Sequence, residues 1–198
     1  IHLEIDLRVD LEKPRLDVVL RHTVRCNTVG AHVLALNGVE LLDMEVRTSG
    51  VDWDYDGQQL QLVWQRRFVR NETRVVELKY AVEEPRSGLF FTHPSPAHPD
   101  ACLLAITDHE TERARHWLCT VDLPSVRPTL SFRITAQQGL TVLANGALKS
   151  ETKNDDGTQT VHWACASNVP SYLTCFAVGD FVRWDGGEVD GVPIAAYA

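Results

Sequence analysis

Apolar and polar residues alternate along most of this 198-residue chain, and no stretch carries the pattern of an amphipathic helix of three turns. The first run places Leu3, Ile5, Leu7 and Val9 at every second position. Further runs with a period of two follow at 18–24, 42–46, 76–82, 130–134 and 161–165. Side chains with this period share one face of a strand, so each run buries one face and exposes the other. We therefore predict an all-β fold: about twelve strands in two curved, mostly antiparallel sheets, a saddle-like sandwich with at most short helical turns.

Residues 1–198 are predicted to form a single domain, because this length supports one sizeable core. The segment 84–100 holds four of the nine prolines, which remove ladder donors, so it is predicted to be a long loop with one short strand at "GLFF". A buried strand is expected next, at "ACLLAI" (101–106). "DWDYDG" (52–57) is interpreted as a hairpin connection, and Asn145-Gly146 within "LTVLANGAL" as a tight turn.

The overall charge and the cysteines restrict the class of protein. The net charge is −8 and no lysine- and arginine-rich stripe is present, so nucleic acid is not an expected partner. No stretch approaches the eighteen or so uncharged apolar residues of a membrane span. The five cysteines are odd in number and none are paired as CxxC, which favours reduced, buried thiols. We accordingly expect a reducing compartment, the cytoplasm.

Two segments resemble metal motifs but lack essential ligands. "HETER", from His109, is one residue away from the zinc motif HExxH, but Arg113 stands at the position of the second histidine. "DWDYDG" imitates the start of a calcium loop, but Val63 stands where the bidentate glutamate belongs. No GxSxG, P-loop or GxGxxG motif is present. The chain is therefore expected to hold no metal ligands and no self-contained active site.

Residues 107–130, "TDHETERARHWLCTVDLPSVRPTL", align without a gap to the pattern "TQxExxxARxxFPCxDxPxxKATF". That pattern is typical of the N-terminal β domain of the membrane-alanyl-aminopeptidase and leukotriene-hydrolase family of zinc metallopeptidases (aminopeptidase N-like). The matching positions are Thr107, Glu110, Ala114, Arg115, Asp122, Pro124 and Thr129. "VPSYLTCFAVGDF", "LTVLANGAL" and "GVPIAAYA" resemble three further family segments in the same order, so the resemblance covers the chain nearly end to end. The chain departs from the pattern at Asp108, where the family has glutamine, and at Cys119-Thr120, where it has Pro-Cys.

The resemblance implies a division of labour between domains. In this family the zinc ligands lie in a following helical domain with "GxMEN" and "HExxH" motifs, neither of which occurs here, so zinc is expected only in the parent catalytic domain. The fragment alone should be inactive. Its expected partners are the catalytic domain of the same polypeptide and the N-terminus of a peptide substrate, from which the parent removes N-terminal residues.

The resemblance also assigns roles to four residues. Glu110 matches the glutamate that contacts the substrate α-ammonium group, and Asp108 matches the residue that lines the first pocket. Pairing an ammonium group with a fixed anion in a partly dehydrated cleft places the scissile bond one residue from the end. Two carboxylates could hold the ammonium group more tightly, or could repel each other and weaken the site. Arg115 and Asp122 are predicted to interact directly and to hold the loop in place.

Two other functions remain open at this level. The family includes a non-catalytic, aminopeptidase-like subunit of the transcription factor TFIID, and "ARHWLCTVDLP" resembles that branch about as well, which would make the chain a scaffold or protein-interaction domain. A free-standing carbohydrate- or protein-binding sandwich is the third reading. The sequence that follows residue 198 in the parent gene discriminates among them, because only the enzyme requires HExxH.

Overall fold

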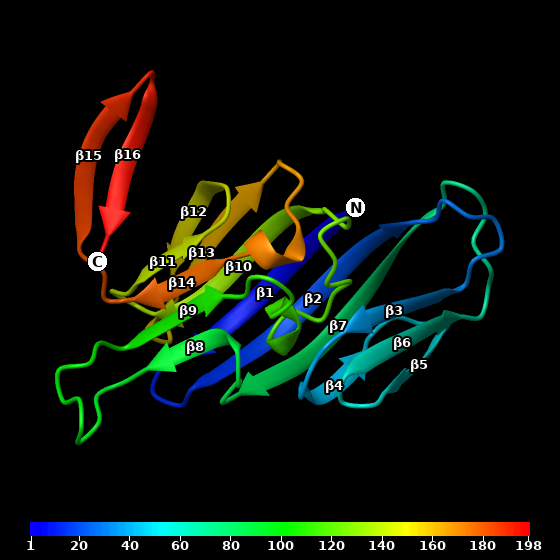
Figure 1. The fold of residues 1–198 in the computed structure, drawn as a ribbon, viewed down its shortest axis with the longest axis horizontal. Coiled ribbons are helices and arrows are strands. Elements are labelled where there is room, and N and C mark those ends of the chain that lie inside the picture. The colour runs from blue at the N-terminus through cyan, green and yellow to red at the C-terminus, as the bar shows by residue number, and fades with distance from the viewer.

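The computed structural model describes all 198 residues and contains sixteen strands and two helical turns of three residues each. Seven strands form the largest sheet (Figure 1). Their order is β12 (Ala147–Lys153), β13 (Thr158–Cys165), β10 (Thr129–Gln137), β1 (His2–Asp10), β2 (Arg15–Arg25), β7 (Thr73–Glu83) and β4 (Leu42–Val46). Only β1 and β10 pair in parallel; all other pairs in this sheet are antiparallel. The prediction of an all-β, mostly antiparallel fold is confirmed, although about twelve strands were expected.

The alternating residues of the largest sheet form its buried face. Ile5 lies opposite Leu20 on β2 and opposite Phe132 on β10, and all three side chains are buried. The intervening positions carry charge: Arg21 of β2 binds Glu77 of β7 at 2.7 Å and Asp6 of β1 at 3.1 Å. The period of two in the sequence therefore separates an apolar inner face from a charged outer face.

Two smaller sheets pack on this inner face (Figure 1). One has the order β11 (Thr141–Ala144), β14 (Phe176–Gly179), β9 (Leu104–Asp108) and β8 (Gly88–Thr92). The other has the order β3 (Val33–Asn37), β6 (Gln59–Trp64) and β5 (Val51–Tyr55). A single cluster of 33 buried residues joins all three sheets, so the chain is held together by one continuous core.

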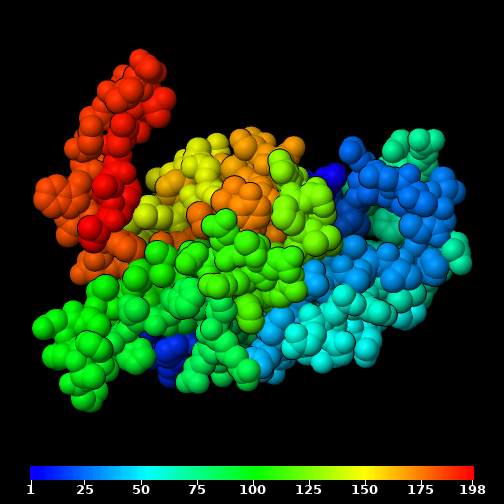
Figure 2. All heavy atoms as spheres, in the orientation of Figure 1, coloured from blue at the N-terminus to red at the C-terminus, as the bar shows by residue number.

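The last two strands, β15 (Arg183–Val189) and β16 (Val192–Tyr197), form a separate two-stranded sheet. Every residue of this hairpin is exposed. Figures 1 and 2 show it as an arm that stands away from the rest of the molecule.

Several local predictions need correction. "DWDYDG" is not a hairpin connection, because Val51–Tyr55 forms strand β5, and the turn begins at Asp56, whose carboxylate accepts hydrogen bonds from two backbone N–H groups. The turn at Asn145-Gly146 exists, but it connects β11 and β12, which belong to different sheets. Gly146 is required there, because it has a positive φ of 99° and a Cβ atom would lie 2.2 Å from the carbonyl oxygen of Ala164.

The structure also differs from expectation at strand β9 and at the cysteines. The strand predicted at 101–106 begins only at Leu104, and Ile106 is exposed. Cys26 and Cys119 are buried, as predicted, whereas Cys102 and Cys175 are exposed. Both exposed thiols lie just before strands, Cys102 before β9 and Cys175 before β14. Their apolar neighbours suggested burial, but outside a strand these neighbours do not place the cysteine side chain on a buried face. The short strand predicted at "GLFF" is confirmed as β8.

Candidate functional site

The candidate site is the segment 107–124, here called the connector, which begins with the last two residues of β9 and then contacts β2, β3 and β7. Burial alternates at its start: Thr107 and His109 are buried, whereas Asp108 and Glu110 are exposed. The Thr107 hydroxyl donates to the Phe176 carbonyl oxygen at 3.1 Å and accepts from the Phe176 N–H at 3.0 Å. Because Thr107 and His109 point into the interior, the alternate residues Asp108 and Glu110 place their carboxylates on the outer surface.

His109 is the anchor between the two carboxylates, whereas the sequence draws attention to it only as the first residue of the incomplete zinc motif. Its side chain is 2% exposed. Nδ1 lies 3.1 Å from the Tyr172 carbonyl oxygen, so Nδ1 carries the proton and donates it to that oxygen. Burial lowers the pKa of His109 below its ordinary value, which keeps the ring neutral. Its ring lies 6.0 Å from that of Trp117, which itself packs edge-to-face on Phe176.

Arg115 and Asp122 are in direct contact, as the sequence predicts. Arg115 Nε donates to Asp122 Oδ2 at 2.9 Å, and the backbone N–H of Arg115 reaches the same oxygen at 3.3 Å. The second oxygen of Asp122 accepts from the Ser171 hydroxyl at 2.6 Å, and the Asp122 N–H donates to Asn37 Oδ1. The Asp122 side chain is fully buried and Arg115 is one quarter exposed. The carboxylate is therefore bonded on both oxygens and closes the connector into a loop.

Residues 117–120 lie beneath the exposed part of the connector and are held by side chains from the largest sheet. The Tyr80 hydroxyl of β7 donates to the Trp117 carbonyl oxygen and accepts from the Cys119 N–H, both at 3.0 Å. His22 Nε2 of β2 donates to the Cys119 carbonyl oxygen at 2.8 Å. Tyr80 and His22 therefore satisfy three buried backbone groups that belong to no strand.

A glycine allows the connector to lie against the second layer. Gly88, at the start of β8, has a positive φ of 78°, and a Cβ atom there would lie 2.1 Å from the carbonyl oxygen of Arg113. Only glycine accommodates both the backbone conformation and this approach. Arg113, which occupies the ligand position in the incomplete zinc motif, thus has its backbone packed on β8.

The residues of the chain do not fit a zinc ion. No group of three or more His, Cys, Asp or Glu side chains is placed to hold a metal. The two helical turns are far too short to span a bilayer.

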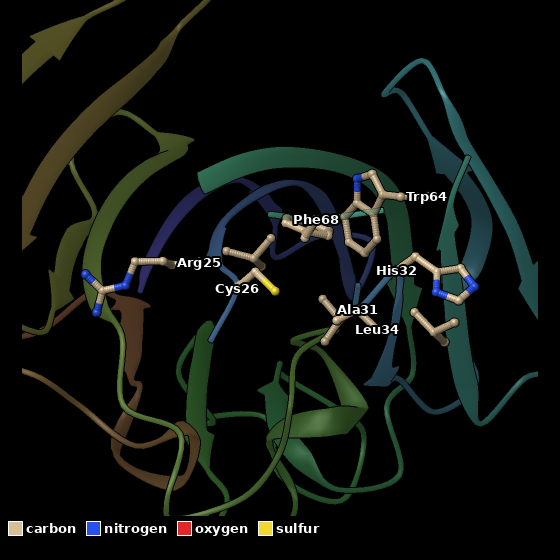
Figure 3. Close-up of a pocket in the computed structure, with 9 residues that line it drawn as sticks. Arg25, Cys26, Ala31, His32, Leu34, Trp64 and Phe68 are labelled. Atoms are coloured by element: carbon tan, nitrogen blue, oxygen red, sulfur yellow. The ribbon is translucent and has the colours of Figure 1, made fainter. Parts of the chain in front are cut away.

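An apolar pocket lies where β2 and β3 meet (Figure 3), lined by residues that include Ala31, Leu34, Trp64 and Phe68. Its lining includes no residue of the connector.

A mixed seven-stranded sheet, two smaller sheets packed on one of its faces and an anchored connector with two exposed carboxylates define a β domain. The chain belongs to the family described as the Peptidase M1 N-terminal domain, whose sequence profile matches residues 1–173. The resemblance of the connector and its flanking motifs to this family of zinc metallopeptidases is therefore confirmed.

Known proteins agree with this assignment. The chain is 23% identical over 188 residues to the puromycin-sensitive aminopeptidase of Caenorhabditis elegans, covering 92% of this chain and 20% of that protein. It is also similar in fold to the M1 zinc metallopeptidase of Deinococcus radiodurans, with a TM-score of 0.78 and 20% identity over 99% of this chain and 45% of the other. A mutant of that metallopeptidase bound to a Tyr-Ser-Ala substrate gives a TM-score of 0.77 at 19% identity, over 98% of this chain and 45% of that one. The chain thus spans a fifth of the aminopeptidase and less than half of the solved chains.

Proposed function

We propose that the chain is the N-terminal domain of a zinc-dependent aminopeptidase, that it shapes the substrate cleft, and that the connector presents Glu110 to the free α-amine of a peptide. Family membership supports the parent activity. The metallopeptidases of similar fold are more than twice as long as this chain, and one of them is described as a two-domain enzyme. Zinc and hydrolysis are then supplied by a catalytic domain in the same polypeptide, since no metal-binding group is present in this one.

The observation that carries this proposal is the contrast between an exposed carboxylate and its buried supports. Glu110 is exposed, while His109 on one side and Asp122 further along are buried and hydrogen-bonded. A carboxylate held on a fixed backbone binds an ammonium group without first being ordered, which strengthens the pairing and fixes its distance from the reacting bond. A solvated loop acid on mobile backbone lacks this advantage.

Asp108 precedes the buried anchor and is exposed, as Glu110 is. We propose that it lines the pocket for the first side chain of the substrate. Its carboxylate would then favour a cationic first residue and disfavour an acidic one, by simple Coulombic interaction in a partly dehydrated cleft. Replacement of Asp108 by glutamine should lower kcat/KM for lysyl and arginyl substrates relative to leucyl ones. An unchanged ratio would remove Asp108 from the pocket.

The test of Glu110 uses the parent polypeptide and aminoacyl anilides. Glu110→Gln should lower kcat/KM by roughly 10- to 100-fold, since a charge-assisted hydrogen bond contributes about 1.5–3 kcal/mol. Zinc content should stay unchanged. Glu151→Gln, on the exposed strand β12, is the matched control and should retain full activity. Equal activity of the two variants would contradict the role of Glu110.

Two simpler experiments test the parent assignment. The purified 198-residue chain should bind no zinc and cleave no anilide, and hydrolysis by it would overturn the division of labour. The parent sequence after Ala198 should contain HExxH; its absence would favour the non-catalytic scaffold.

We further propose the cytoplasm as the compartment, because Cys102 and Cys175 carry exposed free thiols that an oxidising compartment would consume.

A further inference from the structure

Two loops lie side by side at one end of the molecule, at the right of Figure 1: the loop between β2 and β3 and the loop between β6 and β7. Backbone hydrogen bonds join them. The Gly30 N–H donates to the Phe68 carbonyl oxygen at 3.0 Å, and the Phe68 N–H donates to the Ala31 carbonyl oxygen at 2.8 Å. Residues 25–32 and 65–74 therefore form one structural unit, here called the tip.

The tip concentrates positive charge in a chain that is negative overall. It contains five of the 19 lysines and arginines but only one of the 27 acidic residues, so its net charge is +4 while the rest of the chain carries −12. The single acidic residue is Glu72, whose carboxylate already binds Arg66 and, at 2.9 Å, Arg74. The negative charge within the tip is thus used internally.

The other three arginines of the tip have no acidic partner. Arg25, Arg67 and Arg70 are exposed and form no salt bridge. Arg67 is oriented by one bond, from its guanidinium group to the Gly30 carbonyl oxygen at 2.9 Å. A guanidinium group presents several N–H donors in a fixed plane that matches a carboxylate, so these three side chains are free to bind anionic groups of a partner.

The apolar pocket shown in Figure 3 lies beside these arginines. Arg25 lines it, and the Arg74 guanidinium group lies 3.7 Å from the centre of the ring of Phe68, which also lines it. Seven of the nine lining residues are hydrophobic, and the volume of the pocket is about 110 Å³. An engineered apolar cavity of about 150 Å³ stays dry and binds one benzene molecule, so this pocket accepts a group the size of a single aliphatic side chain.

Strand β3 gives the pocket an unpaired backbone edge. It pairs with β6 on one side, and on its other side the N–H and C=O groups of Asn37 pair with Thr120. Because the direction of bonding alternates along a strand, Val33 and Ala35 direct their backbone groups to this second side, and both are exposed. Val33 and Leu34 line the pocket. An open strand edge accepts an extended peptide, whose alternate side chains then enter adjacent pockets.

We infer that the tip is a docking surface for an acidic peptide segment of another protein, which pairs with the open edge of β3, inserts one aliphatic side chain into the pocket and binds the free arginines through its carboxylates. The charge of the tip favours an acidic partner. The size and lining of the pocket favour one aliphatic side chain, and the unpaired edge favours an extended backbone. No residue of the tip belongs to the connector, so this inference does not rest on the proposed function.

Nucleic acid and membranes fit the tip less well than a peptide does. Binding of single-stranded nucleic acid uses exposed aromatic rings on which bases stack. Trp64 and Phe68 are only 5% and 6% exposed, and Arg74 covers one face of the Phe68 ring. A lipid bilayer offers anionic groups but no backbone that pairs with a strand edge.

Calorimetric titration of the 198-residue chain with short peptides tests the inference. The probe is the peptide EELEE, acetylated at its N-terminus and amidated at its C-terminus. It has no α-ammonium group and cannot use the interaction proposed for Glu110. EESEE, which lacks the aliphatic side chain, and QQLQQ, which lacks the charges, should each bind at least 10-fold more weakly. The indole N–H signal of Trp64 in NMR spectra should shift with EELEE and not with EESEE.

Substitutions separate the two parts of the surface. The variant Arg25→Glu, Arg70→Glu should weaken binding of EELEE at least 10-fold. The matched control Lys149→Glu, Lys153→Glu makes the same change of charge on the exposed strand β12 and should bind EELEE as the unsubstituted chain does. Ala31→Leu fills the pocket and should bind EELEE and EESEE equally. All four charged residues are exposed, so both charge variants should keep their thermal midpoint.

Several results would overturn the inference. They are no binding of EELEE to the chain or to the parent polypeptide, equal binding of EELEE and EESEE by the unsubstituted chain, and equal losses in the arginine and lysine variants. A deoxythymidine decamer that binds more tightly than EELEE, and that the arginine variant no longer binds, would identify a nucleic-acid surface instead. Binding to vesicles of phosphatidylserine and phosphatidylcholine that EELEE does not displace would identify a membrane surface. None of these measurements depends on zinc or hydrolysis, so the proposed function stands or fails separately.

Discussion

His22 links the largest sheet to the connector, and its titration should be visible in the stability of the protein. The ring is 4% exposed and Nε2–H donates to the carbonyl oxygen of Cys119 at 2.8 Å. Burial lowers the pKa of His22 from 6.5 to about 4. The hydrogen bond to Cys119 acts in the opposite direction but does not offset the burial.

The sign of the effect follows from which state binds the proton first. Below pH 6.5 the unfolded chain protonates His22, while the folded chain does so only near pH 4, so acid favours unfolding across this window. One pKa unit corresponds to about 1.4 kcal/mol, which gives a loss of about 2 kcal/mol at pH 5 and about 3 kcal/mol once both states are protonated. The contribution is fully present above pH 6.5.

The variant His22→Gln isolates this contribution, because glutamine keeps an N–H donor for Cys119 but does not titrate. Urea unfolding of both proteins between pH 4 and pH 8 gives the free energy of unfolding at each pH. The free energy of unfolding of the unsubstituted protein minus that of His22→Gln should be constant above pH 7. At pH 5 this difference should be lower by about 2 kcal/mol, because only the unsubstituted protein loses the contribution of His22. Carboxylates that titrate in the same window cancel in this difference. Parallel curves for the two proteins would refute a buried, neutral His22.

Three further substitutions test the supports of the connector. Tyr80→Phe removes the hydroxyl that serves two buried backbone groups and should lower the free energy of unfolding by about 1–3 kcal/mol in urea titrations; a neutral result would contradict its role. Asp122→Asn should lower the free energy of unfolding, measured by thermal unfolding, by about 3 kcal/mol. This is at the low end for a buried ion pair, because Arg115 keeps partial contact with water. An unchanged stability would show that the pair contributes no more than a weak surface salt bridge. Gly88→Ala should displace the backbone of Arg113 and increase protease cleavage within the connector, and an unchanged cleavage rate would show that the close contact is dispensable.

The period-two pattern predicts the largest sheet well, because its strands are long and bury one face each. Strands β1, β2, β7 and β10 run for nine to eleven residues; β1 and β10 alternate throughout, and β2 and β7 alternate over most of their length. Strand β5 is not predicted because Asp52, Trp53 and Asp54 are all exposed and only Val51 is buried, so the stretch resembles a polar turn. Sheet membership depends on partners distant in sequence, and alternation carries no information about those partners.

The sequence predicts site contacts only within residues 107–130, where many positions match the family pattern. The contact between Arg115 and Asp122 joins residues seven apart and follows from the motif. The hydrogen bonds from Tyr80 to Trp117 and from His22 to Cys119 join residues that are 37 and 97 positions apart. A local sequence pattern therefore cannot predict them. The burial of His109 could not be predicted from its neighbours, because a histidine between two acidic residues is normally solvated, and its inward position depends on the contact with the Tyr172 carbonyl oxygen.

The supports of the connector come from different layers, and this has a consequence for function. His22 and Tyr80 belong to the largest sheet, Asn37 to the three-stranded sheet, and Ser171 to the second helical turn. The backbone that carries Glu110 is therefore positioned by the packing of the layers on one another rather than by its own sequence. Under the proposed function, variants that loosen any one layer should weaken recognition of the substrate amine because they give the connector more freedom. Glu110→Gln should weaken the same recognition, by the roughly 10- to 100-fold given above, without loosening any layer.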